Sequence, residues 1–101
     1  MTIILDPEET EKRILLQLTG DLSSRRVLEI GSGIGRLTWR FAHLAGSVVG
    51  LEPDAEKFSQ ANRDFPHNLR GKVEFLPMGL EEYAASTPKN PFDLAILSWS
   101  L

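Results

Sequence analysis

"RRVLEIGSGIGRLT", from Arg25 to Thr38, carries the strongest structural signal in this chain. It begins with strand-forming residues and ends in a pattern that favours a helix. Between them, Gly31, Gly33 and Gly35 stand at alternate positions. Glycine allows tight turns and lets a ligand approach the backbone closely, because it has no Cβ. The stretch therefore predicts a strand, a glycine loop and a helix, and the loop is a candidate ligand site.

The composition is that of an ordinary globular protein, with 42% hydrophobic and 25% charged residues. A length of 101 residues predicts one domain, residues 1–101. The net charge of −3 gives no basic surface for nucleic acid. The chain has no cysteine and only two histidines, far apart in the sequence, so neither a disulfide nor a metal site is expected. With no membrane-length apolar run and no signal-peptide pattern, we expect a cytoplasmic location.

Strand and helix patterns alternate along the chain. The alternation predicts the α/β class, with parallel strands joined by right-handed crossovers. Asp54 is placed to cap one of the helices. We expect strands over residues 25–30, 47–52, 71–77 and 91–100, and helices over 5–20, 35–46, 53–65 and 80–86.

Ligands of open α/β sheets bind beyond the carboxyl ends of the strands, which is where the glycine loop lies. Glu52 ends the second strand, close to the position, about 20 residues after the loop, where a dinucleotide fold places its ribose-binding acid. The loop and Glu52 together predict a ligand that contains adenosine. A nicotinamide site would have its third glycine where this chain has Arg36, and the P-loop pattern is absent.

Four segments carry a family resemblance. "VLEIGSGIGRLT" resembles the first motif of the class I S-adenosylmethionine-dependent methyltransferases, and "VVGLEPD", "VEFLPMGLEEY" and "FDLAILSWSL" follow in that family's order and spacing. The resemblance covers residues 27–101. It implies a Rossmann-like three-layer sandwich with a mostly parallel sheet, in which the four predicted strands are ordered 3-2-1-4. It also implies S-adenosylmethionine as the cofactor, methyl transfer to an unidentified acceptor, and a domain that is incomplete at its C-terminus.

The same resemblance implies roles for individual residues. The glycines would lie under the methionine part and the ribose, Glu29 would orient the loop, and Glu52 would hold the ribose hydroxyls. Where the family often has an acid that contacts the adenine amino group, this chain has Gly79. The implied cofactor-binding residues are Glu29, Gly31, Ser32, Gly33, Gly35, Glu52, Pro53, Met78, Gly79, Leu80 and Ser98. No catalytic residue and no metal ligand is implied.

Two other functions stay open from the sequence: an NAD-dependent oxidoreductase, and a non-catalytic nucleotide-binding or interaction module with the same fold. A small molecule, a protein or an RNA could be the methyl acceptor. The order 3-2-1-4 leaves the fourth strand as an open, apolar edge, and such edges pair with other chains. This predicts either a fragment of a longer methyltransferase, which we favour, or a homodimer through that edge.

Overall fold

A computed structural model describes residues 2–4, 25–86 and 92–97. Within these residues the chain forms a five-stranded sheet in the order β1-β5-β2-β3-β4, and every neighbouring pair is parallel. The predicted helix over 5–20 lies outside the described residues. The strands are β1 (Thr2–Ile4), β2 (Arg26–Ile30), β3 (Ser47–Leu51), β4 (Val73–Leu76) and β5 (Leu94–Leu97). The helices are α2 (Arg36–Phe41), α3 (Ala55–Arg63) and α4 (Leu80–Ser86), with 3-10 turns η1 (Ala42–Leu44) and η2 (His67–Leu69).

The sheet confirms the predicted strand order and corrects the prediction about its edge. The four predicted strands correspond to β2, β3, β4 and β5, which lie in the order 3-2-1-4. However, β1 pairs with β5, with Thr2 opposite Leu94 and Ile4 opposite Ile96. The fourth predicted strand is therefore not an open edge, and the reason for expecting a homodimer through it disappears. Three residues are too short to show a strand period, which is why the sequence pattern missed β1.

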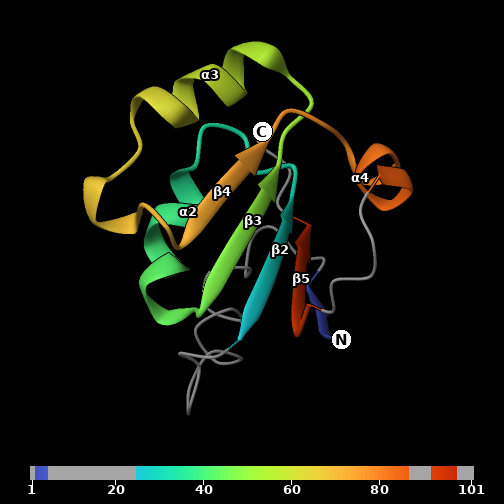
Figure 1. Ribbon diagram of the computed structural model, residues 1–101, viewed down its shortest axis with the longest axis horizontal. Helices are drawn as coiled ribbons and strands as arrows, with labels where there is room; N and C mark the ends of the chain where they lie inside the picture. The colour runs from blue at the N-terminus through green and yellow to red at the C-terminus, as the bar shows by residue number, and fades with distance from the viewer. Residues whose placement is uncertain (1, 5–24, 87–91, 98–101) are drawn as a thin grey trace.

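Helices cover the two faces of the sheet unequally (Figure 1). The connections from β2 to β3 and from β3 to β4 step in one direction, and their helices α2 and α3 lie on one face. The connection from β4 to β5 steps back across the sheet, so a right-handed crossover places α4 on the other face. The larger apolar cluster lies on the α2 and α3 face, and the smaller one, of Leu28, Leu51 and Tyr83, on the α4 face.

The helix boundaries follow local capping rules. Asp54 caps α3 as predicted, because its Oδ1 accepts the amide protons of Glu56 at 3.0 Å and Lys57 at 3.1 Å. The helix predicted over 35–46 is shorter than expected. It ends at Phe41 and continues as the 3-10 turn η1, a common way for a helix to finish.

Candidate functional site

The glycine loop joins β2 to α2 and has an unusual backbone. Gly31, Gly33 and Gly35 have φ angles of 77°, 62° and 91°. These values lie in the left-handed region, which other L-residues enter only with strain. Among the described residues, only glycines have a positive φ. All three glycines of the predicted loop thus adopt a backbone conformation that favours glycine.

The loop is bound to the protein through its own amides. The N–H groups of Gly31 and Ser32 donate to the carbonyl oxygen of Leu51 at 2.9 and 3.0 Å. Gly35 N–H donates to the carbonyl of Ser32 at 3.1 Å. These amides are therefore not available to hold a phosphate, as they are in the glycine loops that bind pyrophosphate.

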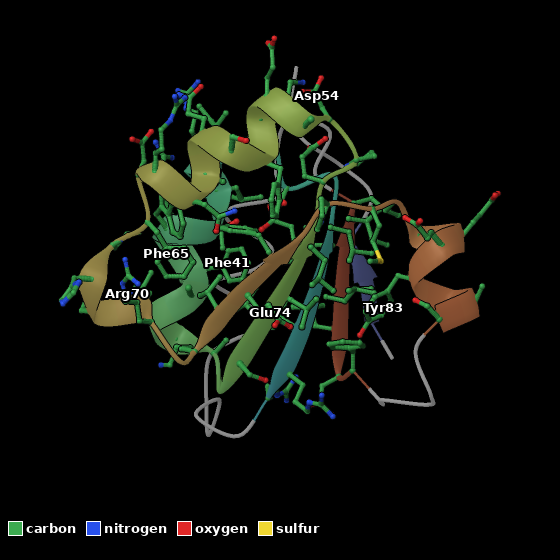
Figure 2. All side chains as sticks on the ribbon, turned by 45° about the horizontal axis from the view of Figure 1, so that its top comes forward. Phe41, Asp54, Phe65, Arg70, Glu74 and Tyr83 are labelled. Atoms are coloured by element: carbon green, nitrogen blue, oxygen red, sulfur yellow. The ribbon has the colours of Figure 1, made fainter. Side chains whose placement is uncertain are left out.

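Glu52 follows β3 and is 5% exposed. Its Oε1 accepts the N–H of Gly33 at 2.7 Å, and its Oε2 accepts the N–H of Asp54 at 2.9 Å. Asp54, labelled in Figure 2, marks this end of the sheet at the start of α3. A carboxylate can accept about four hydrogen bonds, so each oxygen keeps capacity for a ligand hydroxyl. Glu52 both joins the loop to the turn before α3 and offers acceptors beside the loop.

Glu29 is fully buried in β2. The hydroxyl of Thr38, also fully buried, donates to its Oε1. This bond ties β2 to α2 on either side of the glycine loop, and it confirms that Glu29 has a hydrogen-bonded role. Thr38 was not predicted as a site residue. Its position on the buried face of the helix, three residues before Phe41, could have indicated a buried hydrogen bond.

At two glycines, Gly35 in the loop and Gly50 beside it, a neighbouring side chain lies so close that a Cβ would not fit. A Cβ on Gly35 would lie 2.5 Å from the indole of Trp39. A Cβ on Gly50 would lie 2.6 Å from the ring of Phe75 and 3.0 Å from the hydroxyl of Ser32. Gly50 was not predicted as a site residue either, although a glycine inside an apolar strand often marks a place where another segment packs closely against the strand.

Four of the other predicted site residues, Pro53, Met78, Gly79 and Leu80, lie at or near the carboxyl ends of β3 and β4. Pro53 is exposed, and Leu80 is the one exposed large hydrophobic side chain among the described residues. The side chain of Met78 packs against the smaller cluster on the α4 face. A Cβ on Gly79 would meet no atom within 4 Å, so the position has room for a side chain. Ser98 lies outside the described residues.

The sheet brings these segments together. Glu52 N–H donates to the carbonyl of Leu76 at 3.0 Å, so the end of β3 lies beside the end of β4, and Leu51 holds the loop that follows β2. Within residues 2–4, 25–86 and 92–97, no three His, Cys, Asp or Glu residues are grouped to hold a metal ion. In the same part of the chain, no helix has the length and apolar character to cross a membrane.

A family model described as "Methyltransferase domain" matches residues 27–101. The chain is 33% identical over 94 residues to the ubiquinone/menaquinone biosynthesis C-methyltransferase UbiE of Pseudomonas fluorescens (strain Pf0-1). That match covers 89% of this chain and 36% of the relative. The chain thus spans about a third of the length of this relative.

Solved structures give the same result. The tRNA (m1A58) methyltransferase TrmI from Aquifex aeolicus has a TM-score of 0.71 and 28% identity, over 93% of this chain and 37% of that one. A structure described as a DhpI–SAM–HEP complex has a TM-score of 0.60 and 29% identity, over 89% of this chain and 39% of that one.

Proposed function

This chain belongs to the methyltransferase domain family, and from that membership we propose that it is the cofactor-binding part of an S-adenosylmethionine-dependent methyltransferase. The buried carboxylate of Glu52 is the observation that carries the proposal. It lies against the glycine loop with acceptor capacity left over, as a pair of ribose hydroxyls requires.

The loop itself favours this cofactor over a nicotinamide dinucleotide. A pyrophosphate is held by free backbone amides at the start of a helix. Here the amides of Gly31, Ser32, Gly33 and Gly35 are engaged within the protein. The loop can still offer Cα surfaces without side chains, which suits the uncharged ribose and the methionine chain. One related structure is described as a complex that contains SAM.

S-adenosylmethionine, when bound, supplies a methyl group on a positively charged sulfur that is already a good leaving group. The residues of this chain would therefore contribute position more than chemistry. Glu52 would hold the ribose, and the loop would fix the methionine part against the ends of the strands. A general base is needed only if the acceptor must lose a proton, and we assign none.

The acceptor remains unassigned in this proposal. The relatives described above include an enzyme of quinone biosynthesis and a tRNA methyltransferase, and both match the same part of this chain. Because their names imply different acceptors, the shared residues fit the shared cofactor better than any one acceptor. A cytoplasmic location, expected from the sequence, also stays a prediction.

Calorimetric titration of the purified chain tests the proposal. S-adenosylmethionine and S-adenosylhomocysteine should bind saturably, and binding should be lost in Glu52→Ala. The matched control is Glu74→Ala, which removes an exposed carboxylate from the middle of β4 and should bind as the wild type does. Preferential binding of NAD would overturn the proposal. If the cofactor binds but a longer chain containing these residues transfers no methyl group to any acceptor tested, the non-catalytic alternative would be favoured.

A further inference from the structure

We propose that Gly50 is a positioning residue for the cofactor site, because the absence of its side chain lets the glycine loop lie close to β3. The inference rests on the proposed function, and it states that Gly50 raises the affinity for S-adenosylmethionine without contacting it. Gly50 lies in the segment "VVGLEPD", two residues before Glu52, and was not among the residues that the resemblance implied for the site.

The gap follows from the register of the sheet. Glu29, Gly50 and Phe75 lie side by side on adjacent strands and face the α2 and α3 side. The central member of this row has no side chain, so the loop can fold back over β3. The Ser32 hydroxyl occupies that gap, 3.0 Å from where a Cβ of Gly50 would stand.

The Ser32 hydroxyl is held by shape rather than by polar contacts. Its oxygen is buried and has no hydrogen-bond partner among the described residues. Since a buried hydroxyl without a partner is unfavourable, its position must come from packing. The space that a Cβ of Gly50 would take is bordered by this oxygen at 3.0 Å and by the Phe75 ring at 2.6 Å, so both groups share the gap that Gly50 leaves.

An aromatic cluster fixes that ring and also supports the other end of the loop. Phe75 makes edge-to-face contacts with Trp39, at 5.4 Å between ring centroids, and with Phe65, at 5.8 Å. Trp39 in turn lies against Gly35, where a Cβ would be 2.5 Å from its indole. Figure 2 shows Phe65 in the layer below α3. Both ends of the loop therefore rest on one cluster, through Gly50 at Ser32 and through Trp39 at Gly35.

The aromatic cluster borders open space on one side. Phe65 and Phe75 also line an open pocket of about 330 Å³ at the outer edge of β4. A methyl group added at Gly50 can push the Phe75 ring toward this space, and the φ of Gly50 is not positive, so alanine is compatible with the strand. We therefore expect Gly50→Ala to fold, with the Phe75 ring and the Ser32 hydroxyl both displaced.

The experiment is titration of Gly50→Ala with S-adenosylmethionine, together with amide hydrogen exchange of the cofactor-free protein. Because the loop must return to its original position to bind, we expect the dissociation constant to rise about tenfold, which corresponds to about 1.4 kcal/mol of binding free energy. Exchange at the Gly31 and Ser32 amides, which bond to Leu51, should become faster. The control is Val49→Ile, which adds one carbon to the neighbouring residue on the opposite face and should change neither quantity.

A second substitution separates positioning from general damage. A Cβ on Gly50 would meet the Phe75 ring first, at 2.6 Å, so Phe75→Leu is the substitution that makes room for the added methyl. The dissociation constant of Phe75→Leu/Gly50→Ala should lie within about threefold of that of Phe75→Leu, since most of the overpacking cost is then relieved. Failure of this rescue, with Gly50→Ala folded and weakened, would overturn the proposal.

The exchange data keep this proposal distinct from the proposed function. If the wild type does not bind S-adenosylmethionine, the proposed function fails, but unchanged loop exchange in Gly50→Ala would still overturn the positioning role. If Gly50→Ala does not fold, Phe75→Leu removes the ring beside the gap and leaves β3 untouched. Faster exchange at Ser32 in that variant would support the inference, and unchanged exchange would overturn it.

Discussion

Replacing Glu52 by glutamine should destabilise the protein even in the absence of any cofactor. The Glu52 carboxylate accepts one amide proton from Gly33 and one from Asp54, through different oxygens. Glutamine keeps one of these acceptors and turns the other into an NH₂ group, which faces an N–H donor. One charge-assisted hydrogen bond is therefore lost, and one buried donor is left without a partner.

The size of the effect follows from the burial of the site. A hydrogen bond to a charged group contributes about 1.5–3 kcal/mol, and at 5% exposure water replaces it poorly. We expect the free energy of unfolding of Glu52→Gln to fall by about 2 kcal/mol. For a domain of this size, that loss lowers the melting temperature by about 8–16 °C.

Thermal unfolding followed by circular dichroism measures this change, and Glu74→Gln is the control. Glu74 is an exposed carboxylate on β4, and its substitution should stay within about 0.5 kcal/mol of the wild type. If Glu52→Gln melts with the wild type and loses only cofactor binding, the bonds to Gly33 and Asp54 contribute nothing to stability. That result would refute the reasoning and leave Glu52 as a ligand-binding residue alone.

Three further substitutions test separate contacts. Gly35→Ala combines a φ of 91° with a Cβ 2.5 Å from the indole of Trp39, and should lower the free energy of unfolding by about 2–4 kcal/mol. Gly71→Ala, at a φ of 87° with nothing within 4 Å of the new Cβ, should lower it by only about 1 kcal/mol. Equal losses in urea unfolding would contradict the indole contact. Thr38→Val removes the donor to Glu29 and should lower the free energy of unfolding by about 1.5–3 kcal/mol, while Thr38→Ser should retain most of it. Gly79→Asp places an acid in open space where the family often has one, and should tighten S-adenosylmethionine binding about two- to tenfold in calorimetry, with Gly79→Asn gaining less; no gain would mean that adenine does not reach this position.

The features that the sequence predicted well are those with a local cause. Strand and helix patterns predicted four of the five strands, and the side chain of Asp54 was enough to place the start of α3. The order of those strands was predicted from the family resemblance rather than from the pattern. The three loop glycines were predictable because a tight turn between a strand and a helix requires positive φ angles, and the structure has them.

What the sequence did not reveal depends on contacts between segments far apart in the chain. β1 is three residues long, and only its pairing with β5 makes it a strand. The role of Gly50 depends on Phe75, and that of Thr38 on Glu29, in each case across strand or helix boundaries. None of these pairs has a sequence spacing that a periodic pattern could detect.

The same long-range contacts narrow the choice of ligand more than the glycine motif does. A glycine loop after a strand is compatible with a phosphate, a dinucleotide or S-adenosylmethionine. What separates these ligands is where the loop amides point, and here four of them, those of Gly31, Ser32, Gly33 and Gly35, point back to Leu51, Ser32 and Glu52. With these four donors engaged, the glycines can meet a ligand by shape and Glu52 can bind it through its carboxylate, and that combination suits an adenosine with free ribose hydroxyls.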